Sequence, residues 1–289
     1  MKKADPLPRR VLVSAYACAP DRGAEPGVGW NLVAIMAGEY GYELTVITRT
    51  KHRAAIEGSE DPRVKNVRWI YADPPEWLSN KKRGAIGLKA FYLLWQRKMH
   101  EAALEHMRMH RVDLVHHLTF GSILPATILA DLGLPLVVGP VGGAEMSPPE
   151  LVSDLAPRLW IRDRLRAGLY YFGSRLSSTR RTYGACSVAL GATEPSVQLL
   201  RSLGAKDVRL VPQSGCGDDE VAAFSEENPV VDGAPQGPIR ILSASRLVHW
   251  KGVDLSIDAV YQAVEAGHDV QLTILQEGPE LPALKKLVE

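Results

Sequence analysis

The sequence predicts an α/β protein of two domains, each built on a parallel sheet. Short apolar runs rich in β-branched residues recur along the chain, and segments with apolar residues at helical spacing separate them. Hydrophobic residues make up 46% of the 289 residues and charged residues 23%, which is ordinary for a soluble α/β protein. A stretch rich in acidic residues, proline and glycine, residues 219–237, interrupts this pattern and is the expected linker.

Seven runs are predicted to form the strands of the first domain, residues 1–218. They are Val11–Ala15, Leu44–Thr48, Val67–Tyr71, Asp113–His117, Leu136–Val138, Cys186–Leu190 and Val208–Val211. Helices are expected from Trp30 onward, up to about His110, over Leu155–Arg181 and over Glu194–Leu203, where Thr193 before Glu194-Pro195 is a typical helix start. Residues 23–29 are predicted to be a flexible glycine-rich loop, which allows a ligand to approach the backbone closely.

Two of these helical segments are strongly basic and carry aromatic residues. The first has Lys81, Lys82, Arg83, Lys89, Arg97 and Lys98 around Phe91, Tyr92 and Trp95; the second has Arg158, Arg162, Arg164, Arg166, Arg175, Arg180 and Arg181 around Trp160, Tyr170, Tyr171 and Phe172. Such a helix can lie on an anionic membrane surface, or it can pack its aromatics into the core and leave its cations in solvent. Nucleic acid is not an expected partner, because no recognition motif accompanies the charge.

The part of the chain after the linker, residues 238–289, begins with a buried strand over Ile239–Ala244. Arg246 and Lys251 follow in a short loop, and a helix begins at about Val253. Unpaired N–H groups and the helix dipole make such a helix start attractive to anions. An arginine fork and a lysine ammonium beside it can hold a diphosphate, although both side chains can also be ordinary solvated cations.

The charge and the cysteines narrow the functional class. A formal net charge of +1 indicates no general preference for polyanions. Three widely spaced cysteines, Cys18, Cys186 and Cys216, indicate a reducing compartment and neither a disulfide framework nor a metal cage. The basic N-terminus leads into no signal-peptide hydrophobic region, and no run reaches the length of a transmembrane helix. A cytoplasmic location, including the inner face of the membrane, is therefore expected.

Two strings in the second domain resemble the donor domain of retaining glycosyltransferases of family 4. These are SRLVHWKGVDLSIDAV and, about two dozen residues later, LTILQEGPELPALKKL. The resemblance implies a GT-B fold, in which two Rossmann-like domains face each other across a cleft. The first domain would lie on the acceptor side and the second would bind the nucleotide-sugar donor. Arg246, Lys251 and Gly278 would contact the donor, and the two cations would stabilise the leaving diphosphate.

The loops GAEPGVGW and GPVGG resemble a bacterial subgroup of the same family. The resemblance implies that Gly27 and Gly29 contact the acceptor or the transferred sugar through their backbone, and it adds Glu25 as a third contact. A histidine that many members carry after the fifth strand is replaced here by Pro-Val-Gly-Gly. Gly142 and Gly143 bring N–H groups towards a ligand instead, and Glu145 is a further polar candidate.

His116 and His117 end the fourth strand, at the edge of the sheet where α/β proteins bind ligands. A lone histidine is more often structural, but family 4 members commonly carry histidines here, so His116 is a substrate-binding candidate and His117 a catalytic one. The spacing offers no third metal ligand. We expect no metal and no cofactor, since the nucleotide-sugar is a substrate, and we assign no general base.

The second domain is expected to be incomplete. A Rossmann-like half needs roughly 100 residues to bury a core, and residues 238–289 supply only two strand–helix units. The family's nucleobase pocket and its pair of glutamates eight residues apart have no counterpart here, so we read the chain as a piece of a longer enzyme.

The expected function is transfer of a sugar from a nucleotide-diphosphate donor to a hydroxyl, with retention. The acceptor is not readable from the residues; a lipid-linked or polysaccharide acceptor fits the subgroup and the basic helices. Two alternatives stay open: a GT-B sugar-nucleotide epimerase, and a non-catalytic module that binds membrane or acceptor through the first domain. A Rossmann dehydrogenase is disfavoured, because no G-x-G-x-x-G follows the first strand.

Overall fold

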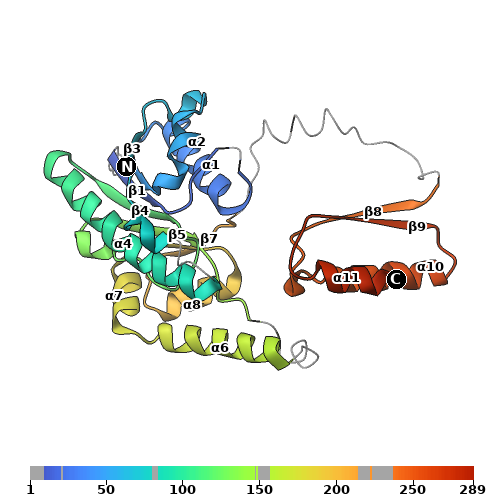
Figure 1. The fold of residues 1–289 in the computed structure, drawn as a ribbon. Coiled ribbons are helices and arrows are strands. Elements are labelled where there is room, and N and C mark those ends of the chain that lie inside the picture. The colour runs from blue at the N-terminus through green and yellow to red at the C-terminus, as the bar shows by residue number, and fades with distance from the viewer. Residues whose placement is uncertain are drawn as a thin grey trace, which may run out of the picture. The chain divides into compact units, whose positions relative to one another are not determined.

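The computed structural model describes residues 10–20, 22–79, 84–146, 148, 157–213, 222 and 237–289. The chain divides into two compact units, Met1–Cys216 and Gly217–Glu289, and each is described by itself (Figure 1). The predicted linker, residues 219–237, lies outside the described residues except for positions 222 and 237. The same holds for Cys216 and for three cations of the first basic segment, Lys81, Lys82 and Arg83.

The first unit is a parallel sheet in the order β3-β2-β1-β4-β5-β6-β7. Its strands are β1 (Arg10–Ala15), β2 (Glu43–Thr48), β3 (Arg68–Tyr71), β4 (Leu114–Thr119), β5 (Leu136–Val141), β6 (Val188–Gly191) and β7 (Val208–Leu210). Each of the seven predicted strands is thus confirmed, with ends that differ by a few residues. The reversal of strand order at β1 is that of a doubly wound sheet, which places ligands beyond the carboxyl ends of the strands.

Helices cover both faces of this sheet (Figure 1). The described helices are α1 (Ala24–Gly38), α2 (Arg53–Glu57), α3 (Glu76–Ser79), α4 (Gly84–Met109), α6 (Pro157–Gly173), α7 (Ser177–Ala185) and α8 (Glu194–Ser202), with 3₁₀ turns η1 (Thr50–His52), η2 (Pro62–Val64) and η3 (Leu129–Leu132).

Alternation along β1 explains the two layers of core. Successive side chains of a strand point to opposite faces. Leu12 joins a buried cluster with Trp95 of α4, and Val11 and Val13 join another with Trp30 of α1. A strand apolar on both faces must be covered on both, which is why the run VLVSA carries almost no polar residue.

Two helix predictions were wrong in their limits. Helix α1 begins at Ala24, so Gly27 and Gly29 lie within a helix and not in a flexible loop. The predicted helix over Leu155–Arg181 is two helices, α6 and α7, separated by a turn in which Ser174 N–H donates to the carbonyl of Tyr170 at 2.9 Å. Residues 155 and 156 lie outside the described residues.

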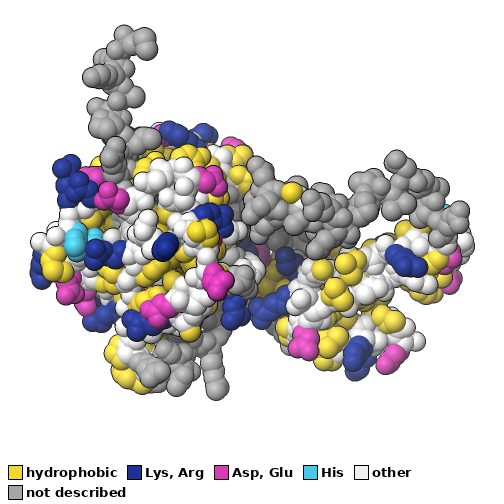
Figure 2. Space-filling model, turned by 90° about the horizontal axis from the view of Figure 1, so that it is seen from above, with side chains coloured by type: hydrophobic (Ala, Val, Ile, Leu, Met, Phe, Trp, Pro, Cys, Tyr) yellow, Lys and Arg dark blue, Asp and Glu magenta, His cyan; other side chains and the backbone are white. Residues whose placement is uncertain are grey.

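The aromatic side chains of the two basic segments differ in burial. In α4 the aromatics Phe91, Tyr92 and Trp95 are buried in the core, as expected if the helix packs against the sheet. In α6, Trp160 and Phe172 are exposed and Tyr170 is buried. On the face in Figure 2, Lys and Arg side chains alternate with Asp and Glu, in keeping with the low net charge.

In the residues that the structure describes, the second unit is a two-stranded parallel sheet with the helices α10 and α11. Strand β8 (Ile239–Ala244) pairs with β9 (Val270–Leu275), and the order along the chain is β8, η4 (His249–Lys251), α10 (Val253–Glu265), β9 and α11 (Leu281–Val288). Its buried cluster is small and consists of Leu247, Val253 and Leu284. The predicted α/β class with parallel sheets is confirmed in both units.

Candidate functional site

At the carboxyl edge of the first unit's sheet, the segments that follow β1, β4, β5, β6 and β7 are joined by hydrogen bonds. Gly142 N–H, after β5, donates to the carbonyl of Gly121, after β4, at 2.9 Å. Ser122 pairs with Gly142 as an isolated parallel bridge. The edge is therefore a defined surface of backbone and polar side chains, in the position where doubly wound sheets bind ligands.

Glu25, in the first turn of α1, reaches across to this surface. Its Oε1 accepts a short hydrogen bond from the N–H of Gly121. Burial raises the pKa of Glu25, and the Gly121 N–H and the nearby Lys51 ammonium act in the opposite direction. Burial thus disfavours the ionised form of Glu25. A carboxyl group with a raised pKa at the ligand-binding edge of a sheet is typical of a functional site.

The glycines of α1 allow this placement. A Cβ on Gly27 would collide with the carbonyl of Arg22, and a Cβ on Gly29 with the carbonyl of Ala17. The first turn of α1 therefore packs directly against the backbone that follows β1, where Ala19 N–H donates to the carbonyl of Pro26 at 3.1 Å. The side of each glycine that lacks a Cβ faces this chain's own backbone, so their predicted role as ligand contacts would have to come from the remaining backbone atoms.

Gly142, Gly143 and Glu145 lie together after β5, as predicted. Gly143 has φ +106°, a conformation that favours glycine, and its N–H donates to Glu145 Oε2 at 2.7 Å. Glu145 Oε1 accepts from Thr193 Oγ1 at 2.5 Å and Ser196 Oγ at 2.8 Å. Burial opposes ionisation of Glu145, but these hydrogen bonds prevail and lower its pKa. This carboxylate is therefore held by donors at the start of α8.

Two polar side chains of this edge were missed from the sequence. Gln213, which follows β7, donates through Nε2 to the carbonyls of Gly121 (2.8 Å) and Pro140 (3.0 Å). Tyr170 of α6 lies 3.0 Å from Ser122, hydroxyl to hydroxyl. Gln213 could have been found, because a polar residue just after a parallel strand lies at the ligand-binding edge. Tyr170 gave no such signal among its aromatic neighbours.

The two histidines of β4 lie on opposite faces of the strand. His116 Nε2 is 2.8 Å from the carbonyl of Gly139. His117 is buried, and its Nε2 is 3.4 Å from the hydroxyl of Tyr92. Burial and the neighbouring His116 lower the pKa of His117 to about 4, so the ring is neutral at pH 7. A catalytic role for His117 stays a prediction.

In the second unit, the two loops with the family 4 resemblance lie against each other. Leu247 N–H donates to the carbonyl of Glu277 at 3.1 Å, and its carbonyl accepts from Glu280 N–H at 3.2 Å. A Cβ on Gly278 would collide with the backbone of Leu247, so this close approach requires glycine. The predicted donor contacts at positions 246, 251 and 278 are thus brought into one region.

Arg246 and Lys251 are exposed at this region. Lys251 ends the turn η4, and Gly252, with φ +62°, is the residue from which α10 starts. Neither side chain makes an ion pair or a hydrogen bond with the residues that the structure describes. The two cations beside a helix N-terminus are therefore available to an anion.

Metal ligands do not gather in the described part of the chain. No group of three or more His, Cys, Asp or Glu side chains there is arranged to hold a metal ion. Within the same residues, no helix has the length and apolar character needed to cross a bilayer. Cys18 and Cys186 are buried free thiols, and burial raises the pKa of Cys186 to about 11, which leaves that thiol unreactive at neutral pH.

No protein-family model matches the sequence, and no curated protein matches it. Solved structures do. A trehalose-6-phosphate synthase from Burkholderia multivorans matches with TM-score 0.52 and 14% identity over 96% of this chain and 65% of its own. A second trehalose-6-phosphate synthase matches with TM-score 0.52 and 13% identity over 97% of this chain and 68% of its own. The catalytic domain of starch synthase IV from Arabidopsis thaliana was solved with ADP and acarbose. It matches with TM-score 0.51 and 12% identity over 96% of this chain and 71% of its own.

The chain has a fold of the GT-B type. At these identities the likeness shows the fold alone, and it confirms the predicted fold class. The chain spans about two thirds of the length of the two synthases. The assignment to family 4 and to its subgroup stays a prediction, as do the roles of the site residues.

The opposite pKa shifts of Glu25 and Glu145 give a prediction. The pKa of Glu25 is raised on folding, so its contribution to stability is present at low pH and is lost as the pH rises through the folded-state pKa. E25Q removes that charge and is expected to be at least as stable as the wild type at pH 7.5. The difference should vanish towards pH 4, as measured by urea unfolding.

E145Q is the matched control for E25Q. The pKa of Glu145 is lowered on folding, so its contribution is present at neutral pH and is lost as the pH falls. E145Q should be less stable than the wild type at pH 7.5 and approach it in acid. Effects of opposite sign at pH 7.5 in the two variants are the expected result; destabilisation of both by the same amount at pH 7.5 would show that Glu25 is an ordinary structural carboxylate.

Proposed function

We propose that the chain belongs to a retaining glycosyltransferase that moves a sugar from a nucleotide-diphosphate donor to a hydroxyl acceptor, in surface polysaccharide or glycolipid synthesis. The observation that carries the proposal is the pair Arg246 and Lys251. They lie on either side of the buried residues Leu247 and Val248, between β8 and the start of α10, and are exposed, without a partner among the described residues. A desolvated diphosphate needs such donors.

The chemistry follows from where charge develops. When the bond between sugar and diphosphate breaks, the leaving diphosphate gains negative charge. A guanidinium offers two parallel N–H donors and the ammonium a point charge, and fixed donors at the leaving group lower the barrier more than they stabilise the intact donor. The N–H groups at the start of α10 add to this field.

The carboxyl edge of the first unit supplies what a hydroxyl acceptor needs. Glu25 offers a hydrogen-bond acceptor, and the Gln213 side chain fixes the loop backbone beside it. Lys51, whose pKa burial lowers, adds a cation near Glu25. We assign the acceptor side to this edge, with Glu25 as the contact to the accepting hydroxyl.

The fold likeness supports a nucleotide-diphosphate donor. One matching protein, the starch synthase IV domain, was solved with ADP, which contains the same diphosphate group. The two synthases and this domain share the fold with the present chain. Fold alone does not fix function, and the donor assignment therefore depends on the two cations.

A transfer assay tests the proposal and separates it from its alternatives. The chain is incubated with a panel of nucleotide-sugars, each with and without hydroxyl acceptors, and anomeric proton signals are followed by NMR. Release of nucleoside diphosphate only with an acceptor, together with a product of unchanged anomeric configuration, is expected. A changed sugar without any acceptor would instead identify an epimerase, and inverted product would exclude the retaining class.

Helix α6 supports a membrane-associated acceptor. Ile161, Leu165, Leu169 and Phe172 follow one another at intervals of three or four residues and are all more than half exposed, with Phe172 at 70%. That spacing places them on one side of the helix. Arg164 is exposed on α6, and Arg175 in the turn after it and Arg180 and Arg181 of α7 are exposed too; the side chain of Arg162 lies outside the described residues. Apolar side chains with flanking arginines suit an anionic lipid surface.

Vesicle co-sedimentation checks this contact. The double variant L165D/L169D is expected to bind vesicles containing anionic lipid at least about tenfold more weakly than the wild type, because a buried leucine contributes roughly 1.5–3 kcal/mol. L255D/L287D, which changes two exposed leucines of the second unit, should bind like the wild type. Salt should weaken wild-type binding. Equal loss in both variants, or equal binding to neutral vesicles, would rule out the α6 surface as the contact.

A further inference from the structure

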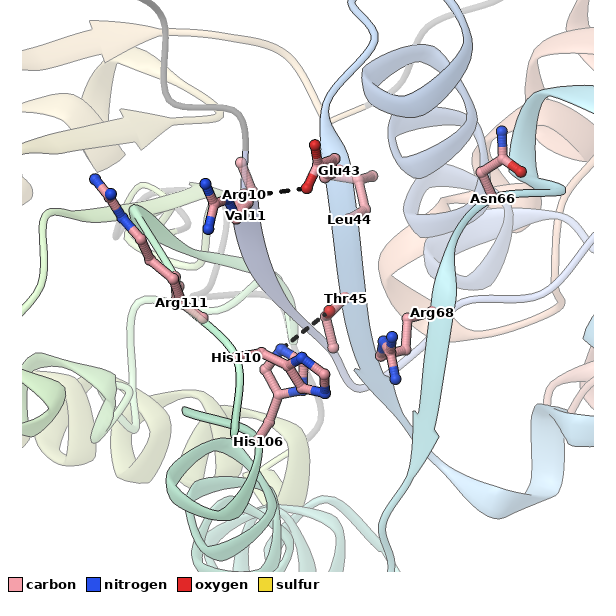
Figure 3. Close-up of a pocket in the computed structure, with 11 residues that line it drawn as sticks. Arg10, Val11, Glu43, Leu44, Thr45, Asn66, Arg68, His106, His110 and Arg111 are labelled. Atoms are coloured by element: carbon pink, nitrogen blue, oxygen red, sulfur yellow. Dashed lines mark hydrogen bonds and ion pairs between the residues drawn. The ribbon is translucent and has the colours of Figure 1, made fainter. Parts of the chain in front are cut away.

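A pocket of about 330 Å³ lies where β1, β2 and β3 begin, at the edge of the sheet opposite to Glu25. The buried residues Val11, Leu44, Thr45 and His106 line it, and Arg10, Glu43, Asn66, Arg68, His110 and Arg111 are exposed around them. Figure 3 shows the two histidines of the end of α4 beside Thr45, with the Arg68 side chain on the same side of the histidines as Thr45.

Arg68, His106 and His110 lie together in this pocket, and Arg10 and Arg111 are among the other residues that line it. The rings of His106 and His110 are 4.6 Å apart, centroid to centroid, and His106 Nε2 is 3.2 Å from Thr45 Oγ1. Burial, His110 and Arg68 lower the pKa of His106, so the free pocket disfavours a positive charge on that ring. Such a cluster is unfavourable unless an anion compensates it.

The nearby carboxylates pair with arginines other than Arg68. Glu43 and Asp113 each lie 3.9 Å from Arg10 Nε, and Asp113 also accepts from Arg111 Nε at 2.9 Å. Arg68 makes no ion pair with the residues that the structure describes. Its guanidinium therefore brings an uncompensated charge to a concave site with a hydroxyl donor and two imidazoles.

We propose that this pocket binds a small phosphate-bearing molecule, whose phosphate is held by Arg68, Thr45 and the imidazoles of His106 and His110. A guanidinium recognises phosphate through two parallel hydrogen bonds. Pockets for small ligands begin at roughly 300 Å³, so the volume admits a phosphate with a small organic body. The site lies at the amino ends of the strands, and a ligand there does not compete for Glu25.

Binding should strengthen as the pH falls. His106 faces Thr45 of β2, Arg68 of β3 and His110 of its own helix, with Arg10, Glu43 and Arg111 completing the charged surroundings. A bound phosphate offsets the repulsion that these cations exert on an imidazolium, so binding is coupled to proton uptake. Affinity for phosphate at pH 6 should exceed that at pH 8, after allowance for the phosphate's own titration.

Calorimetric titration with inorganic phosphate at constant ionic strength tests the site. The wild type is expected to bind saturably, and R68Q at least about tenfold more weakly, because a charge-assisted bidentate contact is lost. R201Q removes an exposed arginine of α8 and should bind like the wild type. The same titration of R246Q, which weakens the proposed diphosphate loop, separates the two sites: binding that R68Q loses and R246Q keeps belongs to this pocket.

A second variant guards against misfolding of the first. H110Q changes an exposed side chain that lines the pocket and should weaken binding by removing one imidazole donor, while circular dichroism stays unchanged. Absence of saturable binding by the wild type, or equal affinity in R68Q, H110Q and R201Q, would overturn the proposal. Loss of binding in R246Q alone would assign the phosphate to the second unit instead.

Discussion

Replacement of Trp95 by alanine is expected to lower the free energy of unfolding by about 3–5 kcal/mol, because a fully buried indole leaves a large cavity. Trp95 is completely buried, and its ring lies edge-on to Tyr16 with centroids 5.1 Å apart. Its Nε1 donates to the carbonyl of Ala72 at 2.7 Å, just beyond β3. The substitution removes the packing of α4 on the sheet and leaves that carbonyl without its donor.

Urea unfolding followed by circular dichroism measures this effect. W160A is the matched control, since Trp160 is 47% exposed on α6, and its cost should be within about 1 kcal/mol. The gap between the two variants is the informative quantity. Similar costs for both would mean that α4 does not form the core contact described, and that the basic aromatic segment of α4 lies on the surface.

The double variant R246Q/K251Q is expected to lose nucleoside diphosphate binding by at least about a hundredfold. A hydrogen bond to a charged group contributes roughly 1.5–3 kcal/mol, and two such groups are removed. The variant should keep its fold, because both side chains are exposed and make no ion pair or hydrogen bond with the residues that the structure describes. Calorimetric titration with ADP, UDP and GDP measures the change.

R240Q/K286Q provides the control for this loss. It removes one arginine and one lysine from exposed positions of the same unit, on β8 and α11. A purely electrostatic attraction to the unit's overall charge would weaken equally in both double variants. A specific site would weaken only in R246Q/K251Q, and higher salt would then reduce wild-type binding without abolishing it.

Strands β1, β2 and β5 were predictable because they are mostly buried and therefore read as apolar runs. The expectation of a buried strand over Ile239–Ala244 was wrong in its burial, because the residues of β8 are mostly exposed. Leu136–Val138 was predicted too short: β5 continues to Val141 through Gly139 and Pro140, residues that normally end a strand. The start of α1 was missed for a related reason. Gly27 and Gly29 suggested a loop, but they are in a helix whose first turn packs on backbone.

The site was predictable only in part. Motif spacing brought together the loops of Arg246 and Gly278, because the family resemblance contains both. Contacts between residues far apart in the sequence have no motif that predicts them. The contacts of Glu25 with Gly121 and of Gln213 with Pro140 depend on the order of the strands in the sheet, which cannot be read from the sequence. The basic pocket beside Arg68 was invisible, since its residues come from three strands and a helix end with no shared motif.

The loops around Arg246 and Gly278 are proposed to form the diphosphate site. Backbone amide shifts during titration with a nucleoside diphosphate test it most directly. Saturable shifts over residues 245–254 and 276–280, absent in R246Q/K251Q and present in R240Q/K286Q, are the predicted result. Shifts confined to the first unit, or no saturable shift with any nucleotide, would contradict it.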